Sequence, residues 1–192
     1  MKKYVLEVEH DDDPMNPRVD WDNVTTMICF HRNYNLGDKH DYKKDNFDSW
    51  EQLKEQIESD YKVLMIKPLR LYDHSGITIS TSNEYPFNDR FDSMMVGWIF
   101  IEEKQWTKMM GEDMDRSEDR LDRIIEGEVE TYDQYISGEV YQYSIYEVDT
   151  CSLGHEHKVL LESCGSFFGE EYCEQEGKSH LEYYESEIKK VN

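Results

Sequence analysis

The sequence contains no alanine and is short of basic residues, with 21 Lys and Arg against 43 Asp and Glu among 192 residues. The resulting formal charge of −22 excludes a general nucleic-acid-binding surface, because such a surface needs Lys and Arg to displace counterions from phosphates. It also excludes attraction to anionic membranes. We therefore expect partners of other kinds: basic proteins, cations, or small ligands held in a local pocket.

Long apolar runs are also missing. No stretch approaches the ~18 apolar residues of a membrane-spanning helix, and residues 1–7 carry too many charges for a signal peptide. We therefore expect a cytoplasmic protein with reduced cysteines. The cysteines form no CxxC pair and match no common zinc spacing, and the scattered glycines form no phosphate-binding loop. We expect no metal ion and no cofactor.

Aromatic residues are abundant, at 13% of the chain with 14 Tyr and 4 Trp. A disordered acidic chain would be poor in aromatics, so this chain should fold, and its length suits one acidic domain over residues 1–192. Apolar periodicity locates the elements. Strands are expected at residues 3–8, 23–30, 61–66, 69–72, 77–80, 94–101, 139–148 and 158–161, main helices at 48–60, 117–136 and 169–190, and a short helix near 104–109.

The short spacings between strands within residues 61–101 favour hairpins over crossovers. The predicted class is therefore α+β, with a mainly antiparallel sheet of about seven strands and three main helices. Lys67-Pro68 should divide the apolar run at 61–72, and residues 94–101 should form a central strand covered on both faces. Asp48 is expected to cap the helix at 48–60, with Glu51 completing a capping box.

The helix at 117–136 separates an apolar face from an acidic face. We expect burial of Leu121, Ile125, Val129 and Tyr132, and exposure of Glu118, Asp122, Glu126 and Asp133.

Several histidines lie near aspartates in the predicted loops, and such groups can bind a divalent metal or share a proton. No pair of histidines has HxH or HxxxH spacing, however, and chance neighbours are common among so many acids. Asp73-His74-Ser75 also suggests a nucleophile, but adjacent residues on a turn seldom point at one another as a triad requires. Neither pattern is strong enough to assign a reaction.

The acidic residues themselves are a candidate binding surface for a partner protein. Carboxylates three or four residues apart on a helix lie ~5–6 Å apart, so rows of them can imitate a phosphate backbone toward a basic protein groove. The alternative is a solvated face that keeps the protein in solution. The candidate partner-binding residues are Asp11, Asp12, Asp13, Glu118, Asp119, Asp122, Glu126 and Glu130.

Several segments form a specific pattern as a set: residues 12–18 (DDPMNPR), 21–23 (WDN), 27–38 (MICFHRNYNLGD), 71–81 (LYDHSGITIST), 92–93 (DS), 96–97 (VG), 129–138 (VETYDQYISG) and 162–169 (ESCGSFFG). This set resembles a family of small proteins from phages and other mobile elements of Gram-positive bacteria. Gly165 departs from the pattern, which has an aromatic residue there. The resemblance gives no reaction. It implies a protein made inside an infected cell and, by analogy, an inhibitor of host defence of the anti-restriction or anti-CRISPR kind.

The polar residues of these segments leave two alternatives open. They could converge on one pocket for a ligand or a reaction, or they could form a buried network in which Arg32 pairs with a carboxylate and holds the loops. The candidate pocket residues are Trp21, Asp22, His31, Arg32, Asp38, Asp73, His74 and Ser75.

Our leading hypothesis is a phage-encoded inhibitor that binds the basic nucleic-acid channel of a host defence nuclease, with a Cas9-type enzyme as the first candidate. The alternatives are an enzyme or ligand-binding protein that uses the His/Asp loop pocket, and an accessory protein without an inhibitory target.

Overall fold

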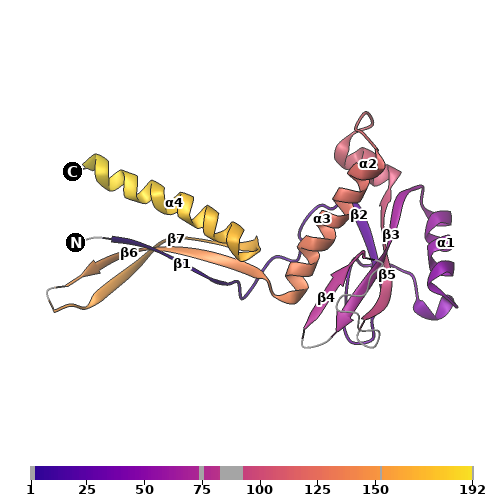
Figure 1. Ribbon diagram of the computed structural model, residues 1–192, viewed down its shortest axis with the longest axis horizontal. Helices are drawn as coiled ribbons and strands as arrows, with labels where there is room; N and C mark the ends of the chain where they lie inside the picture. Colours follow the sequence, from indigo (N-terminus) through magenta and orange to yellow (C-terminus); the bar gives the residue numbers. More distant parts are fainter. Residues whose placement is uncertain (1–2, 74–75, 83–92, 152, 192) are drawn as a thin grey trace. The chain divides into compact units, whose positions relative to one another are not determined.

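The computed structural model describes residues 3–73, 76–82, 93–151 and 153–191. Within these ranges the chain forms seven strands in two antiparallel sheets, together with four α-helices and a short 3-10 helix (Figure 1). The predicted α+β class and the antiparallel pairing are confirmed. The prediction of one sheet was wrong, because the strands form two sheets. The count of three main helices was slightly off, because the short helix expected near 104–109 is a fourth α-helix, α2 (Glu103–Met110).

The two sheets belong to two compact units. Unit 1 comprises Met1–Met15 and Gly138–Asn192, and unit 2 comprises Asn16–Ser137. The single domain over residues 1–192 stays a prediction, and within it each sheet has buried hydrophobic clusters of its own. The apolar pattern of a strand indicates which side chains are buried but not which sheet the strand joins, so the division was not visible in the sequence.

In unit 1, β1 (Lys3–His10), β6 (Val140–Thr150) and β7 (Glu156–Phe168) form a sheet in the order β1-β6-β7. Helix α4 (Glu170–Val191) packs along this sheet (Figure 1). Gly177 permits the close approach, because a Cβ at this position would lie 2.7 Å from Leu6 Cδ1. The core consists of Tyr141, Tyr143, Ile145 and Cys173, with Leu6, Val8, Phe167, Leu181 and Tyr184 packed against them.

Strand β7 is much longer than the segment 158–161 that we predicted, and spans 13 residues. Most of its side chains are exposed, so apolar alternation marks only a small part of it. Its pairing with β6 extends from Val140↔Phe168 to Thr150↔Glu156. Backbone hydrogen bonds form this ladder whatever the polarity of the side chains.

The elements of unit 2 are β2 (Thr25–Cys29), β3 (Val63–Asp73), β4 (Ile77–Ser80), β5 (Ser93–Glu102), α1 (Trp50–Asp60), α2 (Glu103–Met110), α3 (Glu118–Ser137) and the 3-10 helix η1 (Lys44–Asn46). The strands form a sheet in the order β2-β5-β3-β4. Successive side chains of β2 and β5 point to opposite faces of this sheet and enter two different cores, so the sheet is covered on both faces. Helix α1 contributes to one core, and α2 and α3 contribute to the other.

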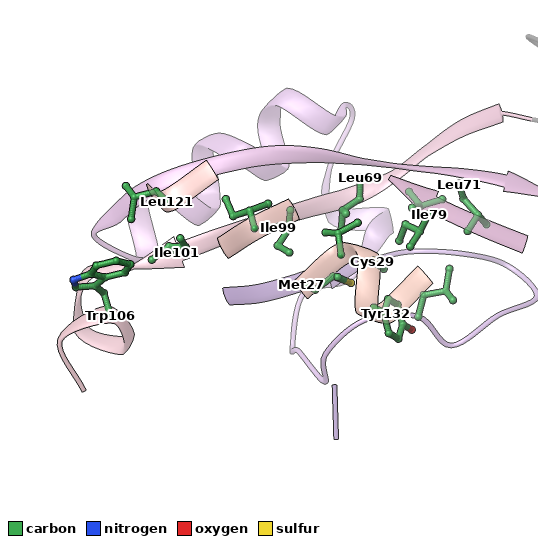
Figure 2. Close-up of a cluster of buried hydrophobic side chains, with 14 residues drawn as sticks. Met27, Cys29, Leu69, Leu71, Ile79, Ile99, Ile101, Trp106, Leu121 and Tyr132 are labelled. Carbon is green, nitrogen blue, oxygen red and sulfur yellow. The ribbon is translucent and has the colours of Figure 1, made fainter. Parts of the chain in front are cut away.

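The larger core joins the sheet to α3 and includes Trp106 of α2, with Ile101 and Leu121 close to its ring (Figure 2). Near the other end of this core, Tyr132 lies beside Met27 and Cys29, and its hydroxyl accepts from the backbone N–H of Gly37 at 2.9 Å. The smaller core, on the α1 side, consists of Ile28, Leu53, Ile57, Trp98 and Phe100.

Strand β5 confirms the prediction of a central strand, because it pairs with both β2 and β3 and is buried from Val96 to Ile101. Its pairing with β3 shifts register at Gly97, where Leu69↔Gly97 is followed by Arg70↔Met95. Val96 is therefore an extra residue of β5 that has no partner in β3, which makes it part of a β-bulge. The bulge interrupts the alternation of β5 side chains between the two cores.

Strand β3 runs without a break through Lys67-Pro68, where we expected a division. Pro68 pairs with Trp98 of β5, but β4 pairs only with Arg70 to Asp73 of β3. Among the described residues, β4 does not reach Pro68, and a proline is tolerated in a strand where the ladder does not need its missing N–H.

The two helix predictions that concern individual residues had different outcomes. Ser49, not Asp48, caps α1, and its side chain accepts from Gln52 N–H at 3.2 Å. In α3, the four apolar residues that we expected to be buried are all buried. Glu118 and Glu126 are exposed as predicted, whereas Asp133 accepts from the Thr78 hydroxyl at 2.7 Å and from Ile79 N–H at 2.6 Å, because α3 packs beside β4.

Candidate functional site

A buried ionic network in unit 2 joins the edge strand β2 to α3. The Arg18 guanidinium donates to Asp38 through Nε at 2.9 Å and through Nη2 at 2.5 Å, and to Glu128 through Nη1 at 2.8 Å. It also donates to the Thr25 carbonyl at 2.9 Å. The Arg18 side chain is 1% exposed, and its two carboxylate partners are 20% and 18% exposed. Both carboxylates in addition accept from backbone N–H groups of the β2 segment, at Met27, Val24 and Thr25.

These contacts keep the guanidinium charged. Burial lowers the pKa of Arg18, but the hydrogen bonds and charges of Asp38 and Glu128 outweigh it, and the net effect raises the pKa above its ordinary value. The network therefore fastens the loop around Arg18 and the loop around Asp38 to β2 and α3. Of the residues that we predicted for a pocket, Asp38 belongs to this structural network.

The arginine of the network was wrongly expected to be Arg32. Arg32 is exposed and lines a cavity, whereas Arg18 is the buried cation. A signal for one member of the network, Glu128, was present in the sequence, although it did not indicate which arginine pairs with it. Glu128 follows Leu121 by seven residues and Ile125 by three, so it falls on the apolar stripe of α3, where a lone acid indicates a buried ionic partner.

A second cluster joins the end of β2 to the end of β3. The rings of His31 and Tyr34 stack with centroids 4.9 Å apart, and the Tyr34 hydroxyl donates to Asp73 Oδ1 at 3.3 Å. The charge of Asp73, followed by burial and by this hydrogen bond, raises the pKa of Tyr34. Two predicted residues, His31 and Asp73, are thus linked through Tyr34, which the sequence had not singled out.

Of the remaining candidate pocket residues, the two that the structure describes, Trp21 and Asp22, do not join this cluster. Trp21 is 40% exposed and lines a separate shallow cavity with Arg123 and Gly127 of α3. Asp22 is exposed. His74 and Ser75 lie outside the described residues. The described candidate pocket residues are therefore divided among a buried network, a His31–Tyr34–Asp73 cluster with Arg32 on the wall of the same cavity, and a surface around Trp21.

The candidate partner-binding acids also divide. Asp11 is engaged within unit 1, where its carboxylate accepts from Asp13 N–H at 3.0 Å and from Ser166 N–H at 2.7 Å. Asp12 and Asp13 are exposed. On α3, Asp122 and Glu126 form ion pairs with Lys67. Glu118, Asp119 and Glu130 are exposed and present carboxylates to solvent.

The density of charge differs between the units. Unit 1 holds 17 acidic residues less 6 lysines and no arginine, a charge of −11 over 70 residues. Unit 2 holds 26 acidic less 15 basic residues, which is also −11 but spread over 122 residues. The acidic character is therefore strongest in unit 1, and the arginines are confined to unit 2.

Within unit 1, one carboxylate binds α4 to the sheet. Glu162 of β7 accepts from the hydroxyls of Tyr143 at 2.8 Å and Tyr184 at 3.1 Å, and lies 2.6 Å from His180 Nδ1. Burial acts to raise the pKa of Glu162, but these hydrogen bonds and the charge of His180 prevail and lower it below its usual 4.5.

Because the folded pKa of Glu162 is lowered, its ionised form stabilises unit 1 above the ordinary pKa, and this stabilisation is lost as the pH falls through the folded pKa. Glu162→Gln should lower the free energy of opening of unit 1 by about 1–2 kcal/mol at neutral pH and should flatten its acid dependence. Amide hydrogen exchange of β6 as a function of pH measures this. Glu185→Gln, at an exposed position of α4, is the matched control, and equal acid dependence in all three proteins would contradict the assignment.

Comparison with family models, curated proteins and solved structures gave no match to this chain. Among the described residues, none of the helices has the length and apolar character needed to cross a bilayer. The same residues contain no group of three or more His, Cys, Asp or Glu side chains arranged to hold a metal ion.

Proposed function

We propose that this chain is an acidic binding protein that occupies the basic nucleic-acid channel of a host defence nuclease, with a Cas9-type enzyme as the first candidate. The observation that carries the proposal is the set of exposed carboxylates on α3, where Asp119 and Glu130 lie opposite the buried apolar stripe and Glu118 is exposed at the first residue of the helix. Such carboxylates can form charge-assisted, often bidentate, contacts with the arginines that line a nucleic-acid channel.

The source and location follow from the resemblance of the chain to phage proteins. A phage inhibitor of this kind acts in the cytoplasm of the infected cell, where the nuclease is. Its overall charge steers it toward basic grooves, because attraction between opposite fields raises association rates. The same charge keeps it off the nucleic acid itself.

The acidic face can be tested by reversing its charge. Replacing Glu118, Asp119 and Glu130 with lysine should weaken inhibition of the target nuclease at least about tenfold, because exposed interfacial charges act mainly through attraction and steering. Single exposed substitutions change stability by only ~0.5 kcal/mol, so the variant should remain folded. Inhibition by the wild type should also decline as salt rises, since the screening length falls to ~8–10 Å near physiological ionic strength.

The control carries the same change of charge on another helix of unit 2. It replaces Glu51, Glu55 and Glu58 of α1, which are exposed, with lysine. The measurement is a cleavage assay with a panel of host defence nucleases. Equal inhibition by both triple variants would show that α3 is not the binding face. If the wild type inhibits no nuclease of the panel, the proposed function is wrong, and ligand binding or an accessory role becomes the better hypothesis.

The alternative of a ligand-binding protein is also supported by a specific observation. His31 and Arg32 line a cavity of about 250 Å³ at the end of β2. This arrangement can bind a ligand whether or not the acidic face binds a nuclease.

A further inference from the structure

Two cavities adjoin in unit 2, and both are lined by Phe30 and Lys44. The first, of about 150 Å³, is otherwise lined by Phe47, Asp48, Ser49, Trp50 and Leu53. The second, of about 250 Å³, is otherwise lined by Cys29, His31, Arg32, Tyr34, Asn35 and Leu36. Together they reach the lower part of the ~300–1,000 Å³ range of small-ligand pockets.

The two cavities differ in chemistry. The first is an aromatic chamber in which the Phe30 and Trp50 rings lie 6.3 Å apart at an interplanar angle of 34°. Lys44 Nζ lies 5.5 Å from the centroid of the Trp50 ring. Asp48 supplies a carboxylate at the wall of this chamber. An apolar, planar group that carries an amino substituent suits these walls, because it can stack on the rings and donate to the carboxylate.

The second cavity gathers positive charge and hydrogen-bond donors. Arg32 and Lys44 are cations on its wall, in a protein whose net charge is −22. His31 adds a donor. Its Nδ1 accepts from the N–H groups of Asn33 and Tyr34, both at 3.2 Å, so a neutral imidazole carries its hydrogen on Nε2. Arginine, lysine and an imidazole N–H are the groups that bind a phosphate.

We propose that these adjoining cavities bind a nucleoside monophosphate, with the base in the chamber of Trp50 and the phosphate at Arg32, His31 and Lys44. Lys44 belongs to both walls and lies between the two parts of such a ligand. The site is independent of the acidic face of α3, and its failure would leave the proposed nuclease binding untouched.

The overall charge selects a mononucleotide over a nucleic-acid strand. A strand brings one phosphate per nucleotide, and its binding needs a track of cations that releases counterions. This chain offers a local group of two cations in a protein whose net charge is −22, so phosphates beyond the first meet the repulsion of that net charge. A free mononucleotide and a nucleic-acid strand both offer a base and a phosphate, and the titration distinguishes these two ligands.

The test is calorimetric titration of the full chain with AMP, whose amino group matches Asp48, and with adenosine, inorganic phosphate and a single-stranded deoxyadenosine oligomer. AMP should bind at one site per chain, at least about tenfold more tightly than adenosine, phosphate or the oligomer per site. The Trp50 ring lines the chamber, so AMP should also change tryptophan fluorescence.

Variants locate the site. Arg32→Gln and Lys44→Gln, at exposed positions, should each weaken AMP binding about tenfold, as expected for a lost charge-assisted hydrogen bond. Trp50→Leu should weaken AMP and adenosine alike. Lys104→Gln, an exposed position of α2 outside both cavities, removes the same charge and should bind AMP as the wild type does.

Four results would overturn the proposal. The first is no AMP binding at concentrations up to about 10 mM. The second is phosphate binding as tight as AMP binding, which would leave the aromatic chamber without a role. The third is tighter binding of the oligomer, which would replace the mononucleotide with a strand. The fourth is wild-type affinity for AMP in the Arg32→Gln variant, once circular dichroism has shown that this variant is folded.

Discussion

Replacement of Arg18 by alanine should lower the free energy of unfolding of unit 2 by about 3–5 kcal/mol, the range found when one partner of a buried ion pair is removed. The substitution leaves Asp38 and Glu128 facing each other across the vacated position without their cation. Both carboxylates also hold backbone N–H groups of the β2 segment, so their relaxation toward water would disrupt the edge of the sheet.

Tryptophan fluorescence is a selective probe for this experiment. All four tryptophans, at positions 21, 50, 98 and 106, lie within Asn16–Ser137, so urea unfolding followed by their emission reports unit 2. Arg32→Ala removes the same side chain from an exposed position and should change stability by no more than ~0.5 kcal/mol.

A second variant separates charge from packing. Glu128→Gln keeps the shape of the side chain but removes one negative charge from the network, and it should cost less than the loss of Arg18 because Asp38 still pairs with the guanidinium. If Arg18→Ala and Arg32→Ala unfold at the same urea concentration, the network contributes no stability and the predicted role of Arg18 is wrong.

The elements of this fold were predictable because most of them carry an apolar period. The helix α3 shows Leu121, Ile125, Val129 and Tyr132 at helical spacing, and β5 is a continuous apolar run. Strand β7 was mostly missed because its side chains are exposed and its place is set by backbone pairing. The division into two sheets was missed because pairing between distant strands leaves no local mark in the sequence.

The candidate site was predictable in part. His31 and Asp73 were chosen because they flank strand ends, and the structure links them through Tyr34. Arg18 was not chosen because its partners, Asp38 and Glu128, are 20 and 110 residues away along the chain. Lys44 and Trp50 were missed for a similar reason, since a cavity wall is assembled from a loop and a helix end that no short motif joins.

The bulge at Gly97 leads to the second large effect, because Gly97→Ala should lower the free energy of unfolding of unit 2 by about 3 kcal/mol or more. A Cβ at this position would lie 1.8 Å from the carbonyl oxygen of Ile28 and 2.8 Å from its carbonyl carbon. Both atoms belong to the backbone of β2, so no side-chain rotation relieves the clash, and β2 must separate from β5 along pairs that include Ile28↔Trp98 and Cys29↔Gly97.

Gly127→Ala is the matched control for this substitution, since it adds the same methyl group to another glycine of unit 2. A Cβ at Gly127, in the middle of α3, would meet nothing within 4 Å. Alanine favours a helix interior over glycine by about 0.8–1 kcal/mol, so this variant should be more stable than the wild type. Urea unfolding followed by tryptophan emission should therefore move the two variants in opposite directions. If Gly97→Ala unfolds at the wild-type midpoint, the close approach of β2 to β5 is not required for the fold, and the bulge has no structural reason to contain glycine.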